Sequence, residues 1–273
     1  GNDITLNNAN NFSTVLIVSG KDVTLNDTNA IDLGASTVSG ILSVTSSGTI
    51  TDSGVLAVTG TATFAAGAGN DITLNNANDF STVMITTGKD VTLVDANILT
   101  LGTSTISGVL SVTASGAIIQ TGALGVAGEA TFAAGAINDI TLTNPGNDFS
   151  SISVTSANDV TITESNGMSL PSIITSGGGT VTVTSASGNV SVGIVNAGAG
   201  NVTLTASAGD ILSAGSIVTG TTMTLTAGGP DGDVGVTGAG INISALTLNA
   251  TAAGTGEIVI NETNSVTLGS ITT

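Results

Sequence analysis

The sequence predicts an all-β protein, specifically a right-handed parallel β-helix of about 12 coils, each with roughly 20–23 residues and three short strands. Three observations support this fold class: a long internal repeat, a shorter repeat of about 21 residues, and aliphatic residues that alternate with Thr and Ser. A helical fold is improbable because Gly and β-branched residues dominate and no 3.6-residue stripe appears. We expect one continuous solenoid over residues 1–273.

The long repeat fills the first half of the chain. Residues 1–68 open with GNDITLNNANNFSTV and residues 69–136 with GNDITLNNANDFSTV, and the two blocks match at 47 of 68 positions without a gap. A degenerate third copy covers residues 137–165 and opens with INDITLTNPGNDFSS. We expect each 68-residue block to form about three coils of roughly 22–23 residues.

The shorter repeat occupies about residues 175–273. Its strands read VTVT at 181–184, NVTL at 201–204, MTL at 223–225, LTL at 246–248 and VTL at 266–268. The first aliphatic residues of these strands are spaced 21, 21, 23 and 20 positions apart: Val181, Val202, Met223, Leu246 and Val266. A fixed step with short strands and Gly-rich corners predicts one coil per step.

Each short strand alternates aliphatic and polar residues, as expected for a strand with one face inside the coil and the other in solvent. In a Val-Thr-Leu triplet the two aliphatic side chains point to one face and Thr to the other. Inward aliphatic residues then stack on the same position of the next coil. Gly and Asn accept the positive φ of sharp corners, and the chain contains 38 Gly but only 3 Pro.

The composition excludes several functions. There is no Cys or His, so thiolate and imidazole metal sites and Ser–His or Cys–His catalysis are ruled out. Only two basic residues, Lys21 and Lys89, oppose 19 Asp and Glu, which rules out a nucleic-acid footprint. No apolar run is long enough for a membrane-spanning helix, so no membrane insertion is expected. No coil gathers Asp, Glu and Lys together, and the sequence therefore predicts a protein that is not an enzyme.

Both ends of the sequence already belong to the repeat. An exposed last coil is an open sheet edge, which solenoids normally cover with a cap. We expect the chain to bind itself head-to-tail through its first and last coils, unless the segment is cut from a longer rod. The expected interface consists of Asn2, Asp3, Ile4, Thr5, Leu6, Val266, Thr267 and Leu268.

Outward threonines at equivalent positions of successive coils predict a ladder. Its members in the shorter repeat are Thr182, Thr203, Thr224, Thr247 and Thr267. Such arrays resemble those of ice-binding proteins, and a flat array also suits lateral bundling. The simpler interpretation, which we favour, is that Thr is the best polar residue for a solvent-facing strand.

Acidic residues recur at two corners of the long repeat: Asp3, Asp71 and Asp139 at one, and Asp22, Asp90 and Asp159 at the other. Oxygen-rich corners bind Ca²⁺ in some proteins, and GGPDGD at 228–233 is faintly similar to a calcium-binding β-roll turn. A β-roll needs that turn in tandem, and here it occurs once. We therefore expect no cofactor, with Ca²⁺ as the open alternative.

The run GNVTLTASAGDI at 200–211 resembles filamentous-haemagglutinin-like secreted proteins, which are large bacterial β-strand-repeat exoproteins. LSVTSSGTITDSGVLAVTG at 42–60 and LSVTASGAIIQTGALGVAG at 110–128 resemble them too. The resemblance implies a right-handed β-helix, bacterial export, and a role as a surface adhesin or extracellular fibre. It transfers no binding residue.

Three functional hypotheses remain. The leading one is a structural subunit of an extracellular filament, for example in a biofilm matrix, which polymerises head-to-tail through its terminal coils. The second is the spacer or shaft of a large cell-surface adhesin. The third is ice binding through the outward Thr ladder.

Overall fold

The computed structural model describes residues 1–273, and every regular element in it is a β-strand. The chain forms an all-β parallel β-solenoid of about 13 turns with repeat units of about 21 residues, which confirms the predicted fold class. It divides into two compact units, Gly1–Ala130 and Thr131–Thr273. The structure contains no helix that could cross a membrane.

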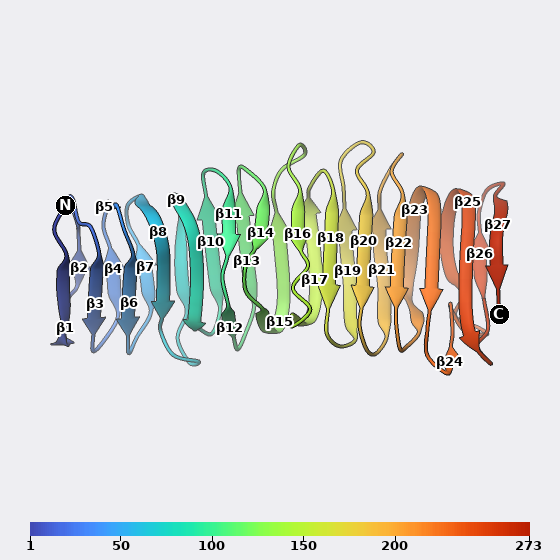
Figure 1. The fold of residues 1–273 in the computed structure, drawn as a ribbon, viewed down its shortest axis with the longest axis horizontal. Coiled ribbons are helices and arrows are strands. Elements are labelled where there is room, and N and C mark those ends of the chain that lie inside the picture. Colours follow the sequence, from blue (N-terminus) through green and yellow to red (C-terminus); the bar gives the residue numbers. More distant parts are fainter. The chain divides into compact units, whose positions relative to one another are not determined.

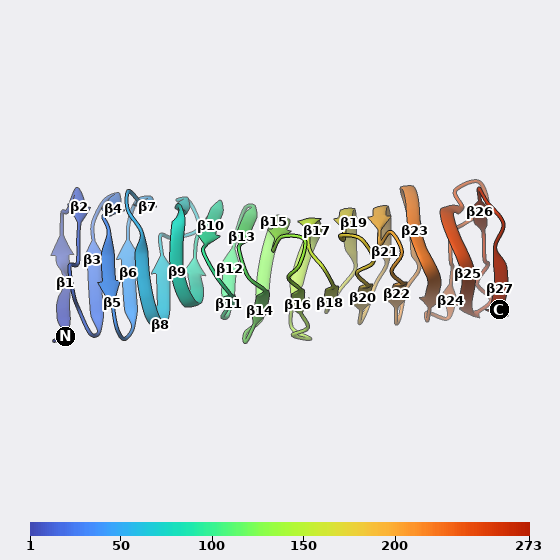
Figure 2. The same ribbon diagram turned by 90° about the horizontal axis from the view of Figure 1, so that it is seen from above.

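The strands of the first unit lie side by side and follow one another along the unit (Figures 1 and 2). They are β1 (Ile4–Asn10), β2 (Thr14–Val15), β3 (Val23–Asp27), β4 (Ile31–Leu33), β5 (Ser36–Val38), β6 (Leu42–Ser46), β7 (Ile50–Asp52), β8 (Leu56–Ala65), β9 (Ile72–Thr87), β10 (Val91–Asp95), β11 (Leu99–Leu101), β12 (Ser104–Ile106), β13 (Leu110–Ala114), β14 (Ile118–Gln120) and β15 (Leu124–Ala133), whose last residues belong to the second unit.

The second unit repeats this arrangement with fewer and longer strands. They are β16 (Ile140–Leu142), β17 (Asp148–Ser156), β18 (Val160–Glu164), β19 (Met168–Ile174), β20 (Val181–Ser185), β21 (Val190–Asn196), β22 (Val202–Ala206), β23 (Ile211–Ala227), β24 (Asp231–Gly232), β25 (Ile241–Gly254), β26 (Ile260–Glu262) and β27 (Thr267–Thr272).

The 68-residue block does not hold a whole number of coils. In the first unit the column of parallel strands that starts at Ile4 continues through Val23, Leu42, Ala62 and Val83, in steps of 19 to 21 residues. Ile72, the sequence equivalent of Ile4, is absent from this column and pairs with Ile50 instead. The expectation of three coils of 22–23 residues per block was therefore wrong. The coils are shorter, so the second block begins one strand further round the coil than the first.

Aliphatic side chains fill the inside of the coils, as the alternation predicts. Strands such as β3, β10 and β18 bury an aliphatic residue at their first and third positions and leave the second and fourth half-exposed. Two aromatic pairs are also buried inside the coils: the rings of Phe64 and Phe80 lie 6.1 Å apart, and those of Phe132 and Phe149 6.3 Å apart, both edge to face.

Candidate functional site

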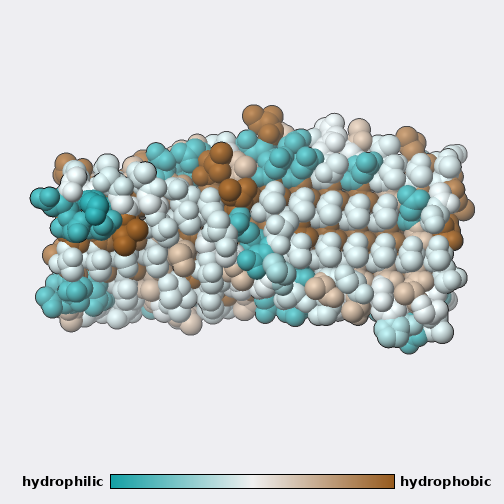
Figure 3. All heavy atoms as spheres, in the orientation of Figure 1, coloured by the Kyte–Doolittle hydropathy of each residue, from teal (hydrophilic) through white to brown (hydrophobic).

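The outward face of the second unit carries two adjacent columns of threonine. The strands β18, β20, β22 and β23 each contain the pattern Thr-x-Thr. The parallel register pairs each of these threonines with the equivalent threonine of the next strand. The first column contains Thr141, Thr161, Thr182, Thr203 and Thr224, and the second contains Thr163, Thr184, Thr205, Thr226, Thr251 and Thr272. Figure 3 shows them as even, pale rows across the strands of this unit.

The predicted ladder was wrong at one step. Met223 pairs with Leu248 and Thr224 with Asn249, whereas Thr247 pairs with Thr222 and Thr267. Thr182, Thr203 and Thr224 therefore share a column, but Thr247 and Thr267 belong to a neighbouring one. The reason is an insertion: β24, which pairs antiparallel with β25, lengthens this coil to 25 residues.

The Thr face is uncharged and regular. Neighbouring strands are about 4.8 Å apart, and residues two positions apart on a strand are separated by about 6.6 Å. All these threonines except Thr272 are half-buried, and side chains at paired positions of neighbouring strands lie close enough to touch. The face therefore offers a lattice of hydroxyl and methyl groups with no charged side chain between them.

The predicted end-to-end residues lie at two open strand edges. Ile4, Thr5 and Leu6 belong to β1, which pairs with β3. Thr267 and Leu268 belong to β27, which pairs with β25, while Val266 comes just before it. Asn2 and Asp3 precede β1 and are exposed. Leu6 is 38% exposed, Leu268 63% and Ile271 43%, although the equivalent residues of inner coils are buried.

The acidic corners of the long repeat cap the backbone and pair with the lysines. Lys21 Nζ lies 2.9 Å from Asp22 and 3.6 Å from Asp3, and Lys89 forms the same contacts with Asp90 and Asp71 at 2.6 and 3.7 Å. Hydrogen bonding to these lysines lowers the pKa of both Asp22 and Asp90.

The third copy of these corners has no lysine. Asp139 there accepts hydrogen bonds from Asn158 and from the Asp159 N–H. Asp159 in turn accepts one from the Thr180 N–H at 2.7 Å. No group of three or more acidic side chains in the chain is arranged to hold a metal ion.

Sequence reasoning missed a second set of acids, which is buried. Asp27, Asp95 and Glu164 occupy equivalent positions at the ends of β3, β10 and β18, and each is at most 1% exposed. Each carboxylate accepts the backbone N–H of a phenylalanine 15 residues earlier, at 2.6, 2.8 and 2.9 Å. The buried acid thus ties one coil to the preceding one.

No lysine pairs with these carboxylates, and burial is therefore the main influence on the pKa of two of them. Burial raises the pKa of Glu164 to about 7, although N–H groups of Phe149, Asn166 and Ser165 oppose the shift. Burial also raises the pKa of Asp95. The sequence signal was an acid two residues after the Val-Thr-Leu or Val-Thr-Ile triplet at equivalent positions of the long repeat, at Asp27, Asp95 and Glu164.

Comparison with known proteins gives a family but no function. A model of a family described as repeats of unknown function (DUF5649) matches residues 20–87 and 88–156. No curated protein and no solved structure matches the chain. The two matched segments together make up half of the chain, so this tandem-repeat β-solenoid belongs to the DUF5649 family of repeats.

Proposed function

We propose that this chain is a structural subunit of an extracellular filament and that its terminal coils stack head-to-tail on those of another copy. The observation that carries the proposal is the state of the two outer strands. β1 and β27 keep the parallel register of the inner coils and have an unpaired edge and exposed aliphatic side chains. Such an edge is a template for a further strand of the same kind.

The charge distribution supports this stacking. Lysine at a strand edge is a common device against edge-to-edge pairing. Only two lysines occur in the chain, and Lys21, the nearer to an end in sequence, is held in ion pairs by Asp22 and Asp3. Neither β1 nor β27 contains a charged side chain. A contact between unlike faces that does not close on itself produces a filament.

A second candidate is the shaft of a cell-surface adhesin similar to filamentous haemagglutinin. The tandem family repeats favour it, because the 68-residue block recurs without a gap. In a shaft the next coil belongs to the same polypeptide, while in a filament it belongs to another copy. Both roles need the same edge pairing, and both place the chain outside the cell.

A third candidate, ice binding, is favoured by the two Thr columns. A regular hydroxyl and methyl lattice is the surface expected to order water against a crystal. Thermal hysteresis of the purified chain tests it, with Thr205→Leu as the variant that interrupts the second column. No hysteresis in the unaltered chain would remove this candidate.

Electron microscopy and sedimentation velocity of the concentrated chain test the filament. We expect species that lengthen with concentration, and short particles when Leu6→Lys and Leu268→Lys add charge at the two edges. Ile137→Lys is the matched control, because Ile137 is 85% exposed outside any strand and its charge should leave assembly unchanged. A chain that stays monomeric at high concentration contradicts the filament. Assembly that is insensitive to the edge lysines contradicts the interface.

A further inference from the structure

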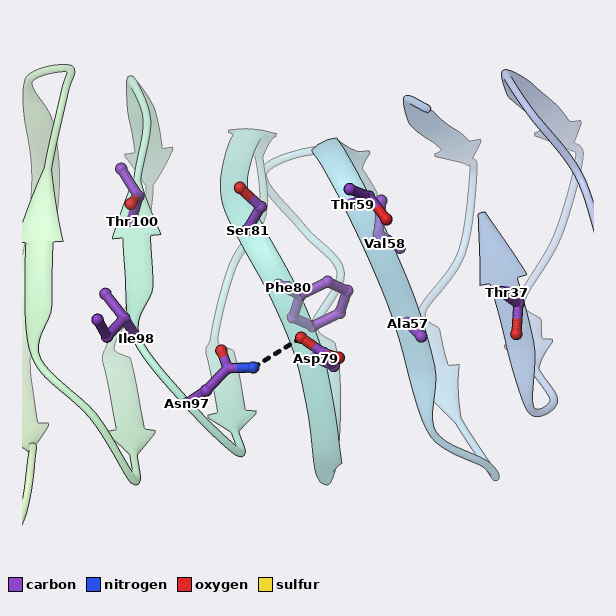
Figure 4. Close-up of a pocket in the computed structure, with 10 residues that line it drawn as sticks. All are labelled: Thr37, Ala57, Val58, Thr59, Asp79, Phe80, Ser81, Asn97, Ile98 and Thr100. Carbon is purple, nitrogen blue, oxygen red and sulfur yellow. Dashed lines mark hydrogen bonds between the residues drawn. The ribbon is translucent and has the colours of Figure 1, made fainter. Parts of the chain in front are cut away.

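The first unit contains a groove that runs across stacked strands. Figure 4 shows it between β5, β8, β9 and the segment after β10. Its base is an outward column in which Thr37 pairs with Ala57 and Ala57 with Asp79. Its volume is about 510 Å³, within the range of small-molecule sites, roughly 300–1,000 Å³.

The polar groups of this groove centre on one carboxylate. Asn97 Nδ2 donates a hydrogen bond of 2.7 Å to Asp79 Oδ1, and the close-up shows both side chains turned toward each other. The hydroxyls of Thr59 and Ser81 line the same groove. The lysine ion pairs lie at Asp3, Asp22, Asp71 and Asp90, so no lysine neutralises Asp79.

The groove recurs one sequence block earlier. A second hollow of about 290 Å³ is lined by Asn11, Phe12, Ser13 and Asn29, the equivalents of Asp79, Phe80, Ser81 and Asn97. Asn29 Nδ2 donates to Asn11 Oδ1 at 2.9 Å, which repeats the Asn97–Asp79 bond. The two differ in where the carboxylate lies: Asp79 takes the place of Asn11 in the larger groove, whereas the carboxylate of the smaller hollow is Asp32. The hollow therefore belongs to the repeated structure and is not confined to one loop.

We propose that the groove around Asp79 binds a neutral linear polysaccharide along the coil axis. The Asp79 carboxylate can accept hydrogen bonds from sugar hydroxyls, while the second N–H of Asn97 and the Ser81 hydroxyl can donate to sugar oxygens. Ala57 and the half-exposed Ile98 (56%) give apolar contacts for sugar C–H groups. The groove follows successive strands, about 4.8 Å apart, and so matches a ligand that is itself extended.

Charge and backbone pairing separate this ligand from other classes. The net charge of −17 and the Asp79 carboxylate, which no lysine neutralises, repel anionic polymers such as uronates and nucleic acid. An extended peptide would bind by adding a strand to an open edge, but β8 and β9 are paired with neighbouring strands. The lining has no exposed aromatic ring, because Phe80 is buried. We therefore expect weak binding at this single groove.

Titration by ¹⁵N-correlated NMR tests the proposal on the unaltered chain, at a dilution at which sedimentation velocity shows it to be monomeric. The probes are neutral hexasaccharides (cellohexaose, xylohexaose, maltohexaose and chitohexaose), with an oligogalacturonate as the anionic comparison. We expect saturable shifts at groove residues for a neutral probe with a Kd of about 1–10 mM. Asp79→Ala should weaken binding about tenfold, and Ala57→Leu should abolish it by filling the groove.

The matched control is Asp71→Ala, which removes a carboxylate of the same unit outside the groove and should leave binding unchanged. No saturable shift with any neutral probe, an equal effect of Asp71→Ala and Asp79→Ala, or tighter binding of the oligogalacturonate would each overturn the proposal. Filament assembly is measured separately on the concentrated chain, so failure of one proposal leaves the other standing.

Discussion

Glu164 gives the sharpest prediction of how this solenoid responds to pH. Its carboxyl group is fully buried at the end of β18, where it accepts N–H groups from Phe149, Ser165 and Asn166. Burial raises its pKa from 4.5 to about 7. Because the folded protein binds this proton more tightly than the unfolded chain, the contribution of Glu164 to the free energy of unfolding is largest below about pH 4.5 and falls as the pH rises to about 7.

The size of the effect follows from the pKa difference. A rise from 4.5 to about 7 corresponds to about 3 kcal/mol, at about 1.4 kcal/mol per pKa unit. Rearrangement of nearby water and peptide groups around the ionised carboxylate reduces this figure, so we expect a loss of about 1–3 kcal/mol. Glu164→Gln removes this proton-binding step, and the difference between the two proteins should therefore flatten above about pH 7.

Two assays measure the effect. The chain has only four glutamates, Glu129, Glu164, Glu257 and Glu262, so ¹³C labelling of Glu carboxyls gives four separate NMR titrations. Urea unfolding followed by far-ultraviolet circular dichroism suits a chain without Trp or Tyr. Glu257 is the matched control, because its hydrogen bonds to Thr237 lower its pKa, and Glu257→Gln should change the pH dependence in the opposite sense.

The reasoning is refuted if Glu164 titrates at or below 4.5, the ordinary glutamate value. It is also refuted if Glu164→Gln leaves the slope of stability between pH 5 and 8 unchanged, since burial of this carboxyl would then carry no free-energy cost.

Three further predictions concern the core and its register, each measured by urea unfolding. Leu248 is 3% exposed and Leu246 66% exposed. Leu248→Asp should therefore lower the free energy of unfolding by several kcal/mol, and Leu246→Asp by under about 0.5 kcal/mol. Equal losses would contradict the register of β25. Phe64→Ala should cost about 3–5 kcal/mol because it leaves a cavity beside Phe80, while Ile137→Ala should have almost no effect; a similar result for both would contradict the packing. Asn78→Ala should cost about 1–3 kcal/mol, because the Asn78 side chain joins the Leu56 N–H to Asp52 inside the coil, and a smaller loss would show that water replaces it.

Local alternation and the repeat were enough to predict the fold class. Within the inner coils, Val-Thr-Leu triplets have one inward and one outward face, and β3, β10 and β22 bury the residues that the pattern selects. The coil length of the second half was also readable, because Val181, Val202 and Met223 follow one another at a constant step.

Register between coils was less predictable than the strands. Ile4 and Ile72 are equivalent in sequence, but this does not show which column of strands each belongs to. The column depends on the number of residues in all the coils between them. The inserted β24 likewise changed the register of β25, so Met223 pairs with Leu248, and Leu246, which the sequence predicted to be inside, is exposed. The groove at Asp79 is lined by residues of several coils, from Thr37 to Thr100, and no local sequence motif predicts it.

Cryo-electron microscopy of the concentrated chain tests the central claim, which is that terminal coils continue the solenoid across subunits. The account predicts filaments in which β27 of one copy lies parallel to β1 of the next, with an unbroken strand spacing of about 4.8 Å along the axis. Filaments joined by their sides, a break in this spacing at each junction, or single solenoids at every concentration would contradict it.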